Sequence, residues 1–64
     1  MKGLRTIREA QEMSQEQLAS ALKVDRSTVT KWETGESYPR GEMLARLADL
    51  LHCTIDALFG RAGA

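Results

Sequence analysis

Residues 14–35 read SQEQLASALKVDRSTVTKWETG and contain two short helix patterns separated by a tight turn. The first pattern opens with a capping box, in which the Ser14 hydroxyl accepts from the backbone N–H of Gln17 and the Gln17 side chain returns to Ser14. Three apolar residues at helical spacing then form the buried stripe of a short helix: Leu18, Ala19 and Leu22.

A second helix is predicted from residue 26 to about residue 33. Asp25 is a favourable N-cap whose charge suits the start of a helix. Gly35 suits the left-handed position that often follows the last turn. Only Lys23 and Val24 lie between the preceding helix and the Asp25 cap, which is too short for antiparallel packing. The two helices are therefore expected to cross at a steep angle and form a helix-turn-helix.

Three further helices are predicted around this pair. The first spans roughly residues 2–12, the second follows Pro39 and ends at His52, and the third begins at a Thr54 N-cap. His52 is expected in the left-handed conformation, which histidine tolerates better than most residues. Apolar residues recur at helical spacing in each of these helices. They are Leu4, Ile7 and the stem of Arg8 in the first, Leu44, Leu47, Ala48 and Leu51 on the inward side of the second, and Ile55, Leu58 and Phe59 in the third. The fold class is therefore all-α, a compact five-helix bundle over residues 1–59, with a flexible tail at 60–64.

Length and composition limit the classes of function. A chain of 64 residues holds one small core, which seldom supplies a net stability of more than ~3–5 kcal/mol. Cys53 has no disulfide partner within the chain and fits a reducing cytoplasm. The pair His52-Cys53 lacks the further ligands that zinc requires. No apolar run approaches the ~20 residues of a membrane span. We expect no catalytic residue, metal, cofactor, membrane association or small-molecule substrate, and hence no enzyme.

The helix predicted over residues 26–33 carries the most informative surface. Nine basic and nine acidic residues give a net charge of zero, so bulk charge does not mark a nucleic-acid binder. At about 100° per residue, Val29, Trp32 and Glu33 share one side. The opposite face is polar and basic and has no acid; it consists of Ser27, Thr30, Lys31 and Thr34, flanked by Arg26. Arginine and lysine donate to guanine, while serine and threonine contact several base edges. Any exposed helix face is polar, but the short preceding helix and tight turn favour DNA.

Taken together, residues 14–35 resemble the helix-turn-helix of Cro and the lambdoid repressors, the xenobiotic-response-element family. The segment from Pro39 to Phe59 is similar to the fourth and fifth helices of that family, so the resemblance covers residues 4–59. It implies a lambda-repressor-like DNA-binding domain of a prokaryotic or phage transcriptional regulator. Most such regulators are repressors, so we expect a cytoplasmic, nucleoid-associated repressor.

The resemblance also implies roles for individual residues. The main base-reading positions of the family match Arg26, Ser27 and Lys31, and its secondary base-reading positions match Thr28 and Thr30. Contacts to the DNA backbone fall to Gln15, Thr34, Ser37, Tyr38 and Arg40. Arg8 and Glu33 match a partly buried ion pair, and Trp32 replaces an aliphatic residue as a core anchor. Lys23 stands where the family often has glycine, so we expect a left-handed lysine at a cost of roughly 1 kcal/mol, with its charge toward phosphate.

Affinity and partners remain to be assigned. One such domain buries little surface, so we expect a homodimer on a palindromic double-stranded operator with half-sites ~34 Å apart. Leu50, Leu58 and Phe59 either form a dimer seam or only close the core. The alternative function is a protein-interaction module on the same fold, an antitoxin or adaptor, which the net charge of zero leaves open. Steep salt dependence of binding distinguishes a DNA-binding domain from such a module.

Overall fold

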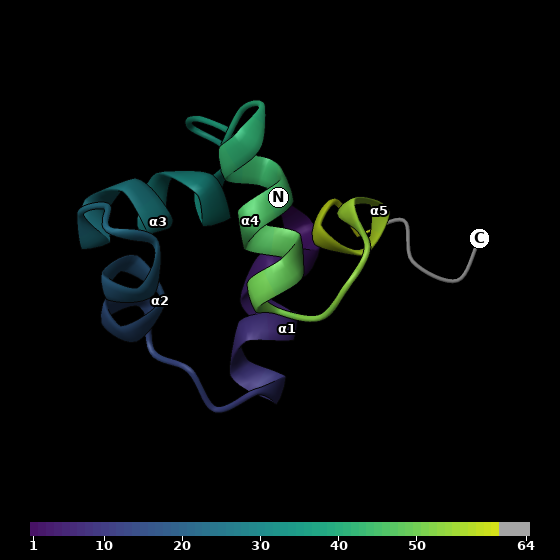
Figure 1. The fold of residues 1–64 in the computed structure, drawn as a ribbon, viewed down its shortest axis with the longest axis horizontal. Coiled ribbons are helices and arrows are strands. Elements are labelled where there is room, and N and C mark those ends of the chain that lie inside the picture. Colours follow the sequence, from purple (N-terminus) through teal and green to yellow (C-terminus); the bar gives the residue numbers. More distant parts are fainter. Residues whose placement is uncertain (61–64) are drawn as a thin grey trace.

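A computed structural model describes residues 1–60 as five helices with no strand in that range (Figure 1). They are α1 (Lys2–Ala10), α2 (Gln15–Leu22), α3 (Arg26–Thr34), α4 (Glu42–Leu50) and α5 (Ile55–Leu58). The all-α class and the five helices are as the sequence predicts. Within the same range, no helix combines the length and the apolar composition needed to cross a membrane. Most of the predicted tail, residues 61–64, lies outside the described residues.

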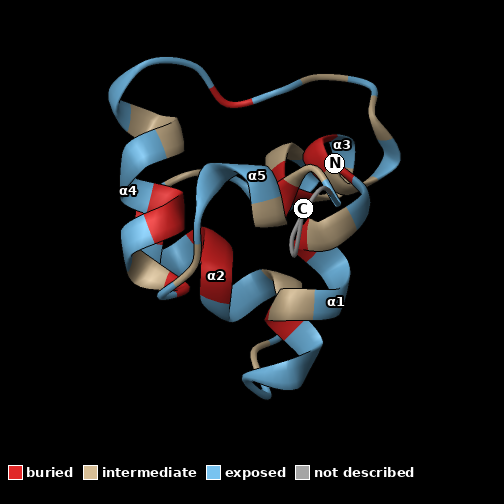
Figure 2. Cartoon of the chain, turned by 90° about the vertical axis from the view of Figure 1, so that its right-hand side faces the viewer, coloured by how far each residue is buried: buried red, intermediate tan, exposed pale blue. Residues whose placement is uncertain are grey.

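A single hydrophobic core lies where the helices meet (Figure 2). Helix α2 packs against α3 and α4, while α1 packs against α3 and α5. The buried apolar side chains are Met1, Leu4, Leu18, Ala19, Leu22, Val29, Trp32, Leu47, Ala48, Leu51 and Leu58. The Trp32 side chain belongs to this core, as predicted, so α3 is anchored by its largest residue.

Local sequence sets the beginnings of three helices. The Ser14 hydroxyl accepts from the Gln17 N–H at 3.0 Å, and the Gln17 side chain accepts from the Ser14 N–H at 2.9 Å. The Thr54 hydroxyl accepts from the Ala57 N–H at 3.0 Å and caps α5. Both caps are as predicted. Asp25 is the N-cap residue of α3 in extended conformation, but its side chain makes no capping hydrogen bond. Its carboxylate therefore acts on the helix start only through charge.

Left-handed residues end the helices and turn the chain. Lys23 has φ 60°, Gly35 has φ 87° and His52 has φ 53°, as the sequence predicts for all three. A fourth, Glu12 with φ 56°, was not expected. It lets the Met13 N–H reach back to the Arg8 carbonyl at 3.1 Å. Helix α1 therefore ends at Ala10, two residues before the predicted boundary.

Helices α1 and α5 approach closely at Gly3. A Cβ atom at this position would lie 1.9 Å from the carbonyl oxygen of Ala57, so only glycine fits between the two backbones. Nearby, the Met1 amino group donates to the Trp32 carbonyl at 3.0 Å in a buried hydrogen bond. The start of α1 is thereby fixed to both α5 and α3.

The structure decides between the two alternatives for Leu58. Leu58 is completely buried and closes the core, so it offers no surface to a dimer seam, whereas Ile55 on the same helix is 43% exposed. Leu50 and Phe59 are half-buried. The Phe59 ring lies 6.0 Å from the ring of Tyr38, which is half-exposed in the loop before α4.

Candidate nucleic-acid interface

The outer face of α3 is exposed at most of its polar residues. Arg26, Ser27, Lys31 and Thr34 are exposed, whereas Thr28 and Thr30 are half-buried. Val29 and Trp32 point to the core, with exposed fractions of 0% and 4%. The helical-wheel assignment of the two faces is therefore correct, and the polar face is accessible to a ligand.

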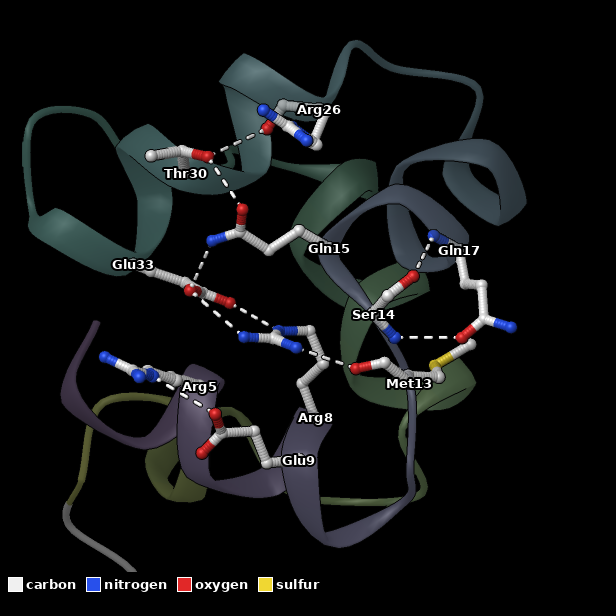
Figure 3. A network of polar contacts seen from close by, with 10 residues as sticks. All are labelled: Arg5, Arg8, Glu9, Met13, Ser14, Gln15, Gln17, Arg26, Thr30 and Glu33. Carbon is white, nitrogen blue, oxygen red and sulfur yellow. Dashed lines mark hydrogen bonds and ion pairs between the residues drawn. The ribbon is translucent and has the colours of Figure 1, made fainter.

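A buried ion pair removes the one acid of α3 from solvent. The Arg8 Nε lies 2.6 Å from Glu33 Oε2, and its Nη2 donates to Glu33 Oε1 at 3.4 Å (Figure 3). The two side chains are only 9% and 7% exposed. Arg8 Nη1 also donates to the Met13 carbonyl at 2.7 Å. The pair implied by the family resemblance is thus present, and the Glu33 charge is neutralised inside the fold instead of opposing phosphate.

Gln15 extends this network from α1 and α3 to α2. Its Nε2 donates to Glu33 Oε1 at 2.8 Å, and its Oε1 accepts from the Thr30 hydroxyl at 3.1 Å. The Thr30 hydroxyl also lies 3.2 Å from the Arg26 carbonyl (Figure 3). The hydroxyl of Thr30 is therefore engaged within the protein, which leaves its methyl group as the uncommitted part for a base contact. Sequence spacing gave no signal for this bond between Gln15 and Thr30.

The residues expected at the DNA backbone lie at both ends of α3. Lys23 is exposed in the turn before the helix. Ser37, Tyr38 and Arg40 follow it in the loop to α4, where Ser37 is half-buried and the other two are exposed. The Thr34 hydroxyl donates to the Lys31 carbonyl at 3.1 Å. These positions flank the reading face rather than forming one cluster.

A surface cavity of about 440 Å³ lies beside this face, between α1, α2 and α3. It brings together two of the expected backbone-contact residues, Gln15 and Thr34, and also contains Arg5, which the sequence reasoning missed. The full lining is Arg5, Arg8, Gln15, Thr30, Glu33 and Thr34. The available signal was the spacing of Arg5 and Arg8, because residues three apart share one helix face.

The pair His52-Cys53 does not form a reactive site. His52 is exposed and Cys53 is half-buried. Burial raises the pKa of the Cys53 thiol, whereas an activated cysteine nucleophile has a lowered pKa. Among residues 1–60, no group of three or more histidine, cysteine, aspartate and glutamate side chains is placed to hold a metal ion.

The capped α2, the two-residue turn and the exposed basic face of α3 define a helix-turn-helix domain. Residues 4–58 match the helix-turn-helix family. The chain therefore belongs to this family, and it is of the xenobiotic-response-element type with a lambda-repressor-like bundle.

Three curated relatives share this domain. The HTH-type transcriptional activator BcrR of Enterococcus faecalis is 40% identical over 55 residues, which cover 86% of this chain and 27% of BcrR. The HTH-type transcriptional regulator DicA of Escherichia coli K12 is 42% identical over 41 residues, or 64% of this chain and 30% of DicA. The cryptic phage CTXphi transcriptional repressor RstR of Vibrio cholerae is 37% identical over 54 residues, or 84% of this chain and 48% of RstR.

The chain thus spans about a quarter to a half of the length of the relatives it matches. No solved structure matches it. The relatives are regulators of transcription, and the family is one of DNA-binding proteins rather than enzymes.

Proposed function

We propose that this domain binds a specific sequence of double-stranded DNA by placing α3 in the major groove. The observation that supports the proposal is the exposed face of α3, which carries Arg26 and Lys31 between hydroxyl side chains. No acid lies on this face, because Glu33 is buried against Arg8. The major groove admits an α-helix, and arginine or lysine donates there to the O6 and N7 atoms of guanine.

Within this proposal, Arg26, Ser27 and Lys31 read bases, and Thr28 and Thr30 make secondary contacts. Gln15, Lys23, Thr34, Ser37, Tyr38 and Arg40 contact phosphates, which fix the register of the protein on the duplex without reading sequence. Gln15 begins α2, and a helix N-terminus favours an anion because its backbone N–H groups point outward.

The proposed binding unit is a homodimer on a palindromic operator. A single small module of this kind buries roughly 600–1,000 Å² on DNA, which is a modest surface for tight binding. Two domains on half-sites ~34 Å apart present their α3 helices to successive turns of the same groove face. The second domain then supplies the remaining affinity.

Repression is the proposed direction of regulation, because a domain seated on an operator that overlaps a promoter excludes polymerase. It is supported by the family resemblance and by the relative described as a phage repressor. Another relative is described as an activator, so the direction needs its own test. A promoter–reporter fusion that carries the recovered operator should lose expression when the protein is produced, whereas a rise in expression would contradict repression.

Selection of bound sequences from a random DNA pool tests the DNA-binding proposal. We expect a palindromic consensus whose half-site spacing reports the dimer. Arg26→Ala should weaken operator binding by ~1–3 kcal/mol and relax preference at one base pair. Arg46→Ala, which removes an exposed arginine from α4, is the matched control and should change neither. Unchanged base preference in Arg26→Ala at fixed salt would rule out the assigned reading face, and salt-independent binding would favour the protein-interaction module.

A further inference from the structure

We propose that Arg5 of α1 is an additional phosphate-binding residue, and that it takes a backbone phosphate of the bound duplex at the cavity between α1, α2 and α3. This inference rests on the proposed function, since the phosphate belongs to the DNA that α3 reads. The cavity of about 440 Å³ opens beside α3 and includes Gln15 and Thr34, both expected at the DNA backbone on other grounds. A phosphate that contacts Gln15 and Thr34 therefore lies at the same cavity that Arg5 lines.

The charges at this cavity favour an anion. Arg8 and Glu33 both line it, but they form a buried pair at 2.6 Å and neutralise each other. Arg5 is the remaining cation of the lining, and its side chain is 70% exposed. Figure 3 shows Arg5 and Gln15 on either side of the Glu33 carboxylate. The net charge of the lining is therefore positive.

The present partner of Arg5 is easily exchanged. Arg5 Nε lies 3.3 Å from Glu9 Oε2, one helical turn further along α1, and the Glu9 side chain is 55% exposed. Such surface pairs contribute little, because water screens both charges. A phosphate accepts two parallel hydrogen bonds from a guanidinium group. Arg5 is therefore expected to leave Glu9 for phosphate when the duplex binds.

The start of α2 also reaches this cavity, through Gln15. The capping box uses the N–H groups of Ser14 and Gln17. Within residues 1–60, the N–H groups of Gln15 and Glu16 have no acceptor. Helix α2 has eight residues and its first, Gln15, lines the cavity. The cavity is therefore lined by Arg5 of α1 and by Gln15, the first residue of α2.

The test compares the salt dependence of operator binding for wild type, R5Q and the control R46Q, by fluorescence anisotropy on the operator recovered by selection. Each phosphate contact contributes about 0.9 to the slope of log affinity against log salt. R5Q should lose this amount in each domain, or about 1.8 for the homodimer, so its affinity deficit relative to wild type should narrow about 12-fold between about 50 and about 200 mM KCl. R46Q loses the same charge from α4 and should keep the wild-type slope. Melting temperatures of all three should agree, since both arginines are exposed.

Two further variants sharpen the outcome. R5K keeps a cation and should retain the wild-type slope, while E9Q frees Arg5 and should raise affinity at low salt. An R5Q slope equal to that of wild type, or an equal loss of slope in R46Q, would overturn the role of Arg5 and leave the proposed function intact. Failure of the wild-type protein to bind any DNA sequence in the selection would overturn both.

Discussion

The buried pair of Arg8 and Glu33 provides a stringent test of what holds this small fold together. Replacing Arg8 by methionine leaves the Glu33 carboxylate 7% exposed, with the Gln15 amide as its remaining donor. Breaking a buried ion pair on one side costs ~3–5 kcal/mol, because an uncompensated charge stays buried. A core of this size seldom supplies a net stability of more than ~3–5 kcal/mol. We therefore expect R8M to be largely unfolded at neutral pH and room temperature.

Removing both charges should be far less damaging than removing one. In the double variant R8M/E33M no buried charge remains, and the apolar chains occupy a similar volume. The remaining cost comes from the Gln15 amide and the Met13 carbonyl, which lose their partners, at about 1–3 kcal/mol for each group left unsatisfied. The double variant should therefore lose clearly less than the sum of R8M and E33M.

Urea denaturation followed by far-UV circular dichroism and Trp32 fluorescence measures these energies. Trimethylamine N-oxide in all samples brings the unstable single variants into a measurable range. The matched control is R5M/E9M, which removes the exposed pair on the same helix and should cost only ~0.3–0.5 kcal/mol. Two results would show that the buried pair does not organise the fold. One is a loss of unfolding free energy in R8M no larger than that in R5M/E9M. The other is a loss in R8M/E33M equal to the sum of the losses in R8M and E33M.

Three other perturbations follow from single positions. Lys23→Gly relieves a left-handed lysine with φ 60° and should stabilise the fold by up to ~1 kcal/mol; a lower melting temperature would contradict this. If Lys23 meets phosphate, the same variant should lose about 0.9 of the salt slope in each domain, or about 1.8 for the homodimer. Gly3→Ala places a Cβ 1.9 Å from the carbonyl oxygen of Ala57, so it should lower the unfolding free energy in urea by ~1–3 kcal/mol or more. The control is Ala10→Gly at an exposed site of α1. An equal loss of unfolding free energy in the control would refute the close approach of α1 and α5. Thr30→Ser keeps the hydroxyl that contacts Gln15, whereas Thr30→Val removes it. If Thr30 acts by positioning Gln15, only the valine variant should lose operator affinity; a serine variant with altered base preference would instead show that the methyl group reads DNA.

The helix ends of this protein are predictable wherever a short sequence decides them. The capping box at Ser14, the Thr54 cap and the Gly35 C-cap involve groups within four residues of one another. The left-handed Lys23 is predictable from the family resemblance, because it stands at the turn position where the family often has glycine. Glu12 is different: glutamate has no preference for φ 56°, and the path from α1 to α2 imposes it. This conformation is set by the tertiary fold, and nothing in the local sequence indicates it.

The buried and exposed faces of the helices, like the helix ends, are predictable only where the local sequence decides them. Nine residues of α3 define a clear wheel, and its buried and exposed sides were predicted correctly. Helix α5 has only four residues, barely more than one turn, so spacing alone could not decide between Ile55 and Leu58 as the inward residue. The bond between Gln15 and Thr30 depends on how α2 crosses α3, a geometry that packing determines and the sequence pattern does not contain. Family resemblance anticipated the pair of Arg8 and Glu33, but not the network around it.

The net charge of zero has a consequence for how this domain is expected to bind DNA. A neutral protein has a weak long-range field, so binding to arbitrary DNA, which draws on phosphate neutralisation alone, should be weak. Under the proposed function, three cations reach phosphate in each domain: Arg5, Lys23 and Arg40. At about 0.9 each they give a salt slope of roughly 2.7 for one domain and roughly 5.4 for a dimer. A measured slope near the larger value would require two domains on the operator, and a slope near zero would leave no role for these cations at the backbone. Because few phosphates contribute, discrimination among sequences must come from Arg26, Ser27 and Lys31, and these are the residues that the burial of Glu33 leaves unopposed on the face of α3.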